Sequence, residues 1–301
     1  MKNSILTKSI SYKDFKKEIL NDYRNIVISR EASLLGRKEV LSGKAKFGIF
    51  GDGKELPQIA MAKVFDKGDF RSGYYRDQTF MFAINKLTVK QFFSGLYANT
   101  SFEEEPMSGG RQMGSHFSSI FVDNKGDFVD LTNQYNISSD ISPTSGQMPR
   151  LLGLAMASKH FRSGKFNSNK LSNNGNEIAW GTIGNASTSE GLFFETVNAI
   201  GVHQVPAVIS IWDDDYGISV DNSYQTTKSS ISEALKGFQR TKTEKGFEIL
   251  TVNGWDYPSL ISTYEHANNI ARNEHVPVII HVTELTQPVG HSTSGSHERL
   301  S

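Results

Sequence analysis

The sequence predicts a three-layer α/β fold, in which helices cover both faces of a mostly parallel sheet, with an N-terminal helical arm before it. Short apolar runs alternate with segments of helical periodicity in the second half of the chain. Two of these runs, Ile178–Ile183 and Val205–Trp212, are almost continuously apolar, as in strands buried on both faces. The N-terminal segment is instead highly charged and carries one apolar stripe, which is typical of a surface helix.

The first elements are predicted from caps and periodicity. Ser11–Ser42 predicts a long helix, because a serine can cap its start and Leu, Ile, Val and Tyr residues form a stripe among many charges. Gly43–Gly53 is a glycine-rich connection, and Pro57–Phe65 predicts a helix that leads into the main domain. We therefore expect an arm over residues 1–45 and one domain over residues 46–301.

The remaining elements follow in order. The small residues of Leu151–Lys159 predict a helix, and Asn167–Asn176, rich in Asn, Ser and Lys, predicts an exposed loop. Further elements are expected at Ile178–Ile183 (strand), Thr188–His203 (helix), Val205–Trp212 (strand), Phe247–Val252 (strand), Pro258–Asn273 (helix) and Val276–Val282 (strand).

Composition excludes several classes of function. The chain of 301 residues carries 32 basic and 32 acidic residues, so its net charge gives no reason to expect nucleic acid or a membrane surface as a partner. It contains no cysteine, which excludes disulfides, zinc–thiolate sites and a cysteine nucleophile. No apolar run reaches membrane-spanning length, and the N-terminus lacks the apolar core of a signal peptide. We expect a cytoplasmic protein.

Polar residues follow two of the predicted strands. Two strands joined by a single helix are expected to be parallel, so their carboxyl ends meet at one edge of the sheet. Asn185 follows the first strand and Asp213–Asp215 follows the second. Open α/β sheets bind ligands at this edge, so we expect a site there. The alternative is an ordinary helix N-terminus beside a solvated acidic loop.

This spacing resembles the thiamine diphosphate motif, Gly-Asp-Gly followed some two dozen residues later by Asn-Asn. Gly184-Asn185-Ala186 matches the first element and Asp213-Asp214 the second, with residues 187–212 between them. Ser189-Glu190-Gly191 and Tyr216-Gly217-Ile218-Ser219 resemble stretches of the alpha subunit of the decarboxylating component of 2-oxo acid dehydrogenases. The resemblance implies thiamine diphosphate and Mg²⁺ as cofactors. The cofactor-binding residues that it implies here are Gly184, Asn185, Ala186, Ser187, Glu190, Asp214, Tyr216 and Ile218.

The implied Mg²⁺ ligands are Asn185, Asp214 and the carbonyl of Tyr216. Both side chains differ from the family's usual residue types, since an amide stands for an acid at 185 and an acid for an amide at 214. One carboxylate and one amide remain, and each offers the oxygen ligand that Mg²⁺ prefers. We interpret the difference as a compensated exchange.

Three further segments extend the resemblance. Tyr75-Arg76 resembles the family's pair that reaches the diphosphate, where a planar guanidinium suits phosphate oxygens. Gly110–His116 and Gly290–Ser294 resemble the segments whose histidines, here His116 and His291, face the substrate and the incoming lipoyl group. A fourth segment, Ser142–Pro149, lies between these and resembles the stretch near the aminopyrimidine of the cofactor, which implies that Ser142 and Thr144 contact it.

Some residues depart from the pattern. Trp212 stands where some branched-chain relatives carry a phosphate-binding arginine, and Gln287 where many relatives carry an arginine. Another cation, such as Arg76, would then have to carry more of the charge. Gly51-Asp52-Gly53 matches the letters of the motif better than residues 184–186 do. No apolar strand delivers the residues that follow it, so we assign it to a turn before a helix.

The resemblance implies an alpha-type part of a 2-oxo acid dehydrogenase that decarboxylates a small 2-oxo acid and transfers the acyl group to a lipoyl group. The Gly-Arg-Gln-Met segment favours branched-chain substrates; a pyruvate or acetoin dehydrogenase, or a non-catalytic relative, is the alternative. A beta part, separate or fused, is expected to complete the site, and a lipoylated transacylase to accept the acyl group, in a dimer or an alpha2beta2 assembly. Because family alpha subunits continue beyond the position of Ser301, we expect an alpha half truncated at its C-terminus.

Overall fold

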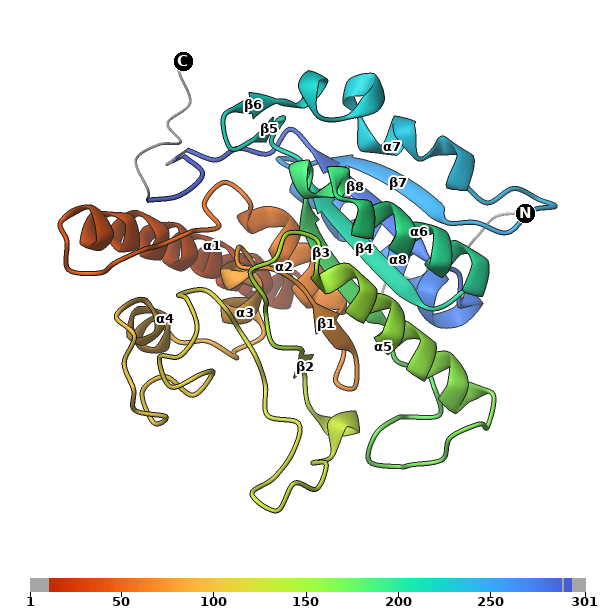
Figure 1. The fold of residues 1–301 in the computed structure, drawn as a ribbon, viewed down its shortest axis with the longest axis horizontal. Helices are drawn as coiled ribbons and strands as arrows, with labels where there is room; N and C mark the ends of the chain where they lie inside the picture. Colours follow the sequence, from red (N-terminus) through yellow and green to blue (C-terminus); the bar gives the residue numbers. More distant parts are fainter. Residues whose placement is uncertain (1–10, 289, 294–301) are drawn as a thin grey trace.

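The computed structural model describes residues 11–288 and 290–293. Its centre is a six-stranded parallel sheet with the strand order β2-β1-β3-β4-β8-β7 (Figure 1). The predicted α/β class with a mostly parallel sheet is thus confirmed. The strands are β1 (Phe70–Ser72), β2 (Asn136–Ile137), β3 (Ala179–Gly184), β4 (Ala207–Trp212), β7 (Glu248–Asn253) and β8 (Val278–Thr283), and a separate hairpin joins β5 (Tyr216–Gly217) to β6 (Val220–Asp221).

Helices cover both faces of the sheet. α5 and α6 lie on one face and α2 and α8 on the other (Figure 1). Alternate residues of the central strands supply the two cores, so that Ile209 packs towards α5 and α6 and Val208 towards α2 and α8. The helices are α1 (Tyr12–Leu41), α2 (Glu55–Val64), α3 (Gln78–Ala83), α4 (Val89–Leu96), α5 (Gln147–Arg162), α6 (Gly191–His203), α7 (Ile231–Ala234) and α8 (Tyr257–Asn269).

The register of the central strands brings the predicted polar residues together. β3 and β4 are neighbours, and Gly184 at the end of β3 pairs with Trp212 at the end of β4. Asn185 and Asp213 are the next residues of the two strands, so they leave the sheet at the same edge. The loop on which Asp214 lies then runs into the β5–β6 hairpin.

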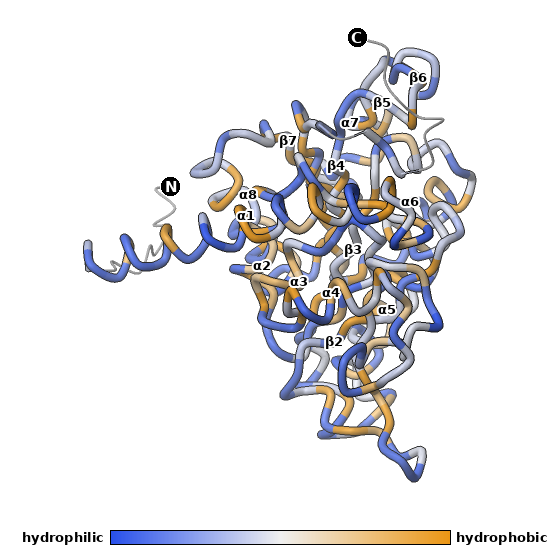
Figure 2. Tube along the Cα trace, turned by 90° about the vertical axis from the view of Figure 1, so that its left-hand side faces the viewer, coloured by the Kyte–Doolittle hydropathy of each residue, from blue (hydrophilic) through white to orange (hydrophobic). Residues whose placement is uncertain are grey.

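The N-terminal helix is confirmed almost as predicted. The side chain of Ser11 accepts a hydrogen bond from the backbone of Asp14 and caps α1. The first turns of α1 are exposed and mostly hydrophilic, and Figure 2 shows them projecting from the body. The later turns pack on α2 and α3, where Arg30 forms a bidentate ion pair with Glu55. The division of the chain at residue 45 stays a prediction.

Most predicted elements are present, with changed ends. The helix predicted from Thr188 begins instead at Gly191, because residues 186–189 form a 3-10 turn that follows Asn185. α2 begins two residues before Pro57, and α5 extends beyond Leu151–Lys159 at both ends. α8 ends at Asn269 and continues as a π-helical turn. Residues 51–53 form a turn before α2, as predicted.

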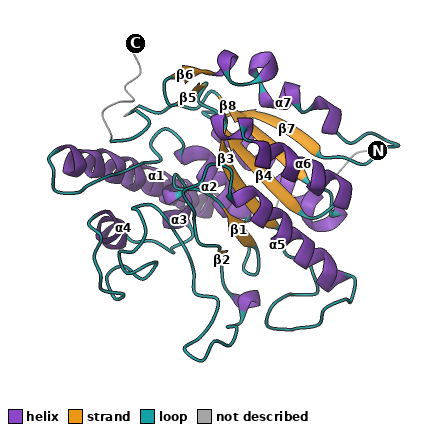
Figure 3. Ribbon diagram, in the orientation of Figure 1, coloured by secondary structure: helices purple, strands orange, loops and turns teal. Residues whose placement is uncertain are grey.

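Several elements have no counterpart in the predictions. β1 and β2 are only three and two residues long, too short for a periodic signal. α3 and α4 follow β1, and Figure 3 shows that the segment between α4 and β2 is almost entirely loop. Within the described ranges, no helix has the length and apolar character needed to span a bilayer.

Candidate functional site

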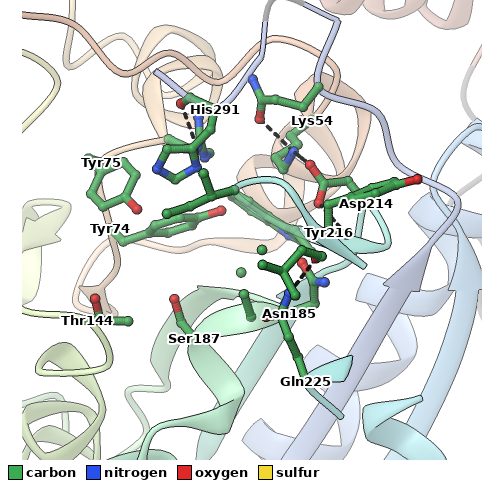
Figure 4. Close-up of a pocket in the computed structure, with 18 of the residues that line it drawn as sticks. Lys54, Tyr74, Tyr75, Thr144, Asn185, Ser187, Asp214, Tyr216, Gln225 and His291 are labelled. Carbon is green, nitrogen blue, oxygen red and sulfur yellow. Dashed lines mark hydrogen bonds and ion pairs between the residues drawn. The ribbon is translucent and has the colours of Figure 1, made fainter. Parts of the chain in front are cut away.

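A pocket of about 350 Å³ lies where β3 and β4 end (Figure 4). The 3-10 turn after β3 forms one wall of the pocket, and the β5–β6 hairpin forms another. Residues just before α2 and α3 close the pocket, together with Gln287 and His291. The lining residues are Lys54, Tyr74, Tyr75, Arg76, Thr144, Gly184, Asn185, Ala186, Ser187, Glu190, Trp212, Asp214, Tyr216, Gly217, Ile218, Val220, Gln225, Gln287 and His291.

The pocket brings together every site residue that the sequence singled out except His116 and Ser142. These two side chains are hydrogen-bonded to each other, with 3.0 Å between His116 Nε2 and Ser142 Oγ. The ring of His116 also stacks on Tyr75, which does line the pocket. His116 and Ser142 therefore support the wall of the pocket at Tyr75.

Two buried polar groups in the pocket have no hydrogen-bond partner among the described residues. They are the side-chain nitrogen of Asn185 and the hydroxyl of Tyr74. Asn185 is 3% exposed, and its backbone oxygen accepts from both the amide and the hydroxyl of Thr188, which fixes the turn. Burial raises the pKa of Tyr74 well above its usual value, so the hydroxyl keeps its proton. Both groups are donors that a ligand could satisfy.

Lys54 is the functional residue that the sequence analysis missed. Its ammonium donates to Asp214 Oδ2 at 2.9 Å, to Gln287 Oε1 at 2.8 Å and to the carbonyl of Thr286 at 3.1 Å (Figure 4). The side chains of Lys54 and Asp214 are only 3% and 7% exposed. Burial lowers the pKa of Lys54 to about 8, and the charge of Asp214 opposes the decrease.

The turn at residues 51–53 explains how Lys54 reaches this position. Gly53 has a φ of +85°, and a Cβ built on it would lie 2.1 Å from the carbonyl oxygen of Thr286. Only glycine allows this close approach, which carries Lys54 to the segment containing Gln287. A lysine directly after a glycine turn and before a helix was the available signal.

Arg76 and His291 form a second cluster of polar side chains in the pocket. Nη2 of Arg76 lies 3.0 Å from Nδ1 of His291, and Nη1 donates to the carbonyl of Phe50. The guanidinium also lies over the ring of Tyr75, 5.4 Å from its centroid. Arg76 is 5% exposed, so the cation is held in place rather than free in solvent.

Hydrogen bonds of the Asp213 carboxylate hold the loop that carries Asp214 in place. This carboxylate accepts from the backbone of Asp215 at 2.8 Å and contacts His281 Nε2 at 2.9 Å. His281 in turn contacts Ser232 Oγ at 2.9 Å. Because Asp213 is buried and bonded on both oxygens, the backbone from Asp214 to Tyr216 has one defined path.

A buried charge network supports the floor of the pocket. Arg71, the middle residue of β1, is fully buried between Asp77 and Asp140. Asp77 also accepts a hydrogen bond from Thr182 of β3 at 2.7 Å. Burial raises the pKa of Asp77 to about 6, although Arg71 opposes the increase. The network ties β1 to β3 directly beneath Tyr74 and Arg76.

The site predicted for a metal ion already contains a cation, the ammonium of Lys54. Asp214, one of the two side-chain ligands, is paired with the ammonium of Lys54. A divalent ion at the same carboxylate would be repelled by this buried ammonium. Within residues 11–288 and 290–293, no group of three or more His, Cys, Asp or Glu side chains is arranged to hold a metal ion. The residues therefore do not fit Mg²⁺ beside Asp214 while Lys54 holds this position.

The fold and the pocket together define a class: a parallel α/β protein with a pocket where neighbouring strands end, lined by cations and hydrogen-bond donors. Comparison with known proteins gives the family. The model of the dehydrogenase E1 component family matches residues 23–297, and the chain belongs to this family.

Relatives in the family are alpha subunits. The chain is 28% identical to the 2-oxoisovalerate dehydrogenase subunit alpha of Bacillus subtilis (strain 168) over 88% of this chain and 69% of that protein. It is 25% identical to the pyruvate dehydrogenase E1 component subunit alpha of Acholeplasma laidlawii over 93% of this chain and 67% of that one. It is 25% identical to the mitochondrial 2-oxoisovalerate dehydrogenase subunit alpha 1 of Arabidopsis thaliana over 84% of this chain and 45% of that protein. The chain is thus an alpha-type part of a 2-oxo acid dehydrogenase, in a family that depends on thiamine diphosphate.

Proposed function

We propose that this chain binds thiamine diphosphate in the pocket where β3 and β4 end and, with a beta-type part, oxidatively decarboxylates a 2-oxo acid. The acyl group would pass to the lipoyl group of a transacylase. The observation that carries the proposal is the meeting of Asn185, Asp214 and Arg76 in one pocket, from segments far apart in the sequence. The family model over residues 23–297 supports it independently.

The chain's own residues would bind the diphosphate end of the cofactor. Small residues at 184, 186 and 187 let a phosphate approach the turn after β3. The Asn185 amide and the Tyr74 hydroxyl offer donors, and Arg76 and Lys54 supply positive charge. Bound there, thiamine diphosphate would supply the nucleophile and the electron sink for decarboxylation.

The two histidines lie at different distances from the pocket, so we propose different roles for them. His291 lines the pocket and would orient the substrate or the lipoyl group. His116 would act through Tyr75, on which its ring stacks. Thr144 also lines the pocket, whereas Ser142 is bonded to His116, so Thr144 is the better candidate for direct contact with the cofactor.

A beta-type part would complete the active site. The resemblance assigns the glutamate that activates the cofactor to the beta part, across the interface. The pocket is open on one side, where a partner could cover the exposed Ile218 and Val220 of the β5–β6 hairpin. An alpha2beta2 assembly, or a dimer of fused chains, is consistent with this arrangement.

The substrate preference follows from the relatives. Two of the three relatives named above act on 2-oxoisovalerate and one on pyruvate, so branched-chain 2-oxo acids are favoured. Pyruvate or acetoin is the alternative. A non-catalytic relative that only binds partners is a second candidate, because Asn185, Trp212 and Gln287 all depart from the family's usual residues.

Calorimetric titration tests the function. Thiamine diphosphate is titrated into the full chain, alone and in complex with a beta-type subunit from the same organism. Decarboxylation of 3-methyl-2-oxobutanoate is then compared with that of pyruvate. We expect saturable binding and a higher kcat/KM for the branched acid. Binding without turnover of either acid would support the non-catalytic relative, and no binding at millimolar cofactor in either form would refute the proposal.

A further inference from the structure

We propose that the ammonium of Lys54 is the resident cation of this pocket: it takes the place of a divalent metal beside Asp214, so that the chain binds a diphosphate without Mg²⁺. This inference rests on the proposed function, because it concerns how the same pocket binds the diphosphate of the cofactor.

The first support is the coordination of the ammonium. Asp214 Oδ2, Gln287 Oε1 and the Thr286 carbonyl surround Lys54 Nζ at 2.9, 2.8 and 3.1 Å. An ammonium has three donors, and three oxygens from this chain accept them. Two of these oxygens come from the segment at residues 286–287 and one from the loop after β4, so the cation links these two segments.

The second support is the position of the other polar groups. The Asn185 nitrogen and the Tyr74 hydroxyl are buried, line the pocket and have no partner among the described residues. Both are donors, so both suit an anionic oxygen rather than a metal ion. A diphosphate oxygen could satisfy each of them, and it could replace Gln287 Oε1 at one N–H of Lys54, while Nε2 of Gln287 stays bonded to Asp52.

The third support is the charge of the pocket. Trp212 is fully buried and uncharged, and Gln287 is neutral, so neither supplies a cation. The lining residues that carry positive charge are Lys54 and Arg76. Nη1 of Arg76 and Nε2 of Gln287 both donate to the carbonyl of Phe50, so Arg76 lies next to the segment that holds Lys54. Of these two cations, Lys54 is the one that pairs with Asp214, where the metal ion would otherwise lie.

The experiment compares metal dependence in matched variants. Thiamine diphosphate and, separately, inorganic pyrophosphate are titrated calorimetrically into the full chain, alone and with its beta-type part. Each titration is done in EDTA and in millimolar Mg²⁺. The variants are Lys54→Met, which keeps the length of the side chain without its charge, and Lys54→Arg, which keeps the charge. Lys90→Met is the control, since Lys90 lies on the surface with its side chain 74% exposed.

Wild type and Lys90→Met should bind in EDTA, with less than about a threefold change on adding Mg²⁺. Lys54→Arg should bind more tightly in EDTA than Lys54→Met does, because it keeps the charge. Lys54→Met should lose about tenfold or more of its affinity in EDTA, the loss expected for a hydrogen bond to a charged group. Mg²⁺ should restore part of this affinity, because the ammonium no longer occupies the position beside Asp214 Oδ2.

Wild-type binding of thiamine diphosphate that requires Mg²⁺ overturns the inference and leaves the proposed function intact. This arm needs no variant, so it holds even if Lys54→Met fails to fold. Equal affinity of Lys54→Met and wild type in EDTA also overturns the inference. If neither ligand binds in any condition, the proposed function fails, and the inference fails with it.

Discussion

Arg76 fixes the ring of His291: Nη2 of the guanidinium lies 3.0 Å from Nδ1 of the imidazole and 3.0 Å from the backbone oxygen of the same residue. A guanidinium only donates, so Nδ1 must accept, and the proton of the neutral ring is on Nε2. One side chain thus sets both the position and the tautomer of a residue that lines the pocket.

Removal of Arg76 should affect cofactor binding and His291 together. Arg76→Ala should weaken thiamine diphosphate binding by about 1.5–3 kcal/mol, the range for a hydrogen bond to a charged group. Arg76→Lys should recover only part of this, because one ammonium cannot bridge Phe50 and His291 as the two guanidinium nitrogens do. Calorimetry with thiamine and with its diphosphate measures the effect, since only the diphosphate should respond. Equal losses for the two ligands would contradict a role at the diphosphate.

The role of His291 can be separated from binding. His291→Ala should leave the Kd for thiamine diphosphate within about threefold, because the hydrogen bonds from Arg76 to Phe50 and to the backbone remain. Acyl transfer to a lipoylated domain should fall by about a hundredfold or more, as for the loss of an acid–base group. Decarboxylation coupled to an artificial electron acceptor is the control and should fall less. A parallel loss in both assays would assign His291 to decarboxylation instead.

Long elements of the fold could be predicted and short ones could not. β3 and β4 are six residues each and almost continuously apolar, so these strands and the helix between them could be predicted. β1 and β2 have three and two residues, and their pairing depends on neighbours that lie far away in sequence. The start of α6 was misplaced because Thr188 and Ser189 resemble cap residues, whereas the structure uses them in a 3-10 turn.

The candidate site likewise has a part that could be predicted from the sequence and a part that could not. Asn185 and Asp214 could be predicted as neighbours because one helical crossover forces the ends of adjacent strands together. Lys54 and Asp214 are separated by 160 positions, and no local pattern links them. The glycine turn before Lys54 was correctly assigned as a turn, but its close approach to Thr286 depends on the folded chain.

The buried network beneath the pocket predicts a pH dependence of stability. Asp77 faces Arg71, Asp140 and Thr182, and its pKa is raised to about 6 in the folded state, against about 3.9 in an unfolded chain. Between about pH 4 and pH 6 the folded state therefore binds more protons at this site than the unfolded state. The free energy of unfolding of the wild type, relative to Asp77→Asn, should decrease as the pH rises through this range.

Urea denaturation at pH 4, 5, 6 and 7 measures this difference. Asp130→Asn is the matched control, because Asp130 is a capping residue with an exposed carboxyl whose pKa is lowered by Thr132. Its difference from wild type should not decrease between pH 4 and 6. If the free energies of unfolding of wild type and Asp77→Asn change in parallel with pH, Asp77 has the same pKa in the folded and unfolded states, which contradicts the prediction.

The ion pair of Lys54 and Asp214 should be strongly coupled in stability. Asp214→Asn leaves a buried ammonium without its partner, and Lys54→Met leaves a buried carboxylate, so each should cost about 3–5 kcal/mol. The double variant removes both charges and should lose much less than the sum of the two. Urea denaturation of the four proteins gives the coupling energy. The cycle of Lys90→Met and Glu104→Gln is the control, because this exposed pair should couple by about 1 kcal/mol or less. A carboxylate reserved for a metal would behave differently: Asp214→Asn would then leave the metal-free protein as stable as the wild type, and the two single variants would be additive.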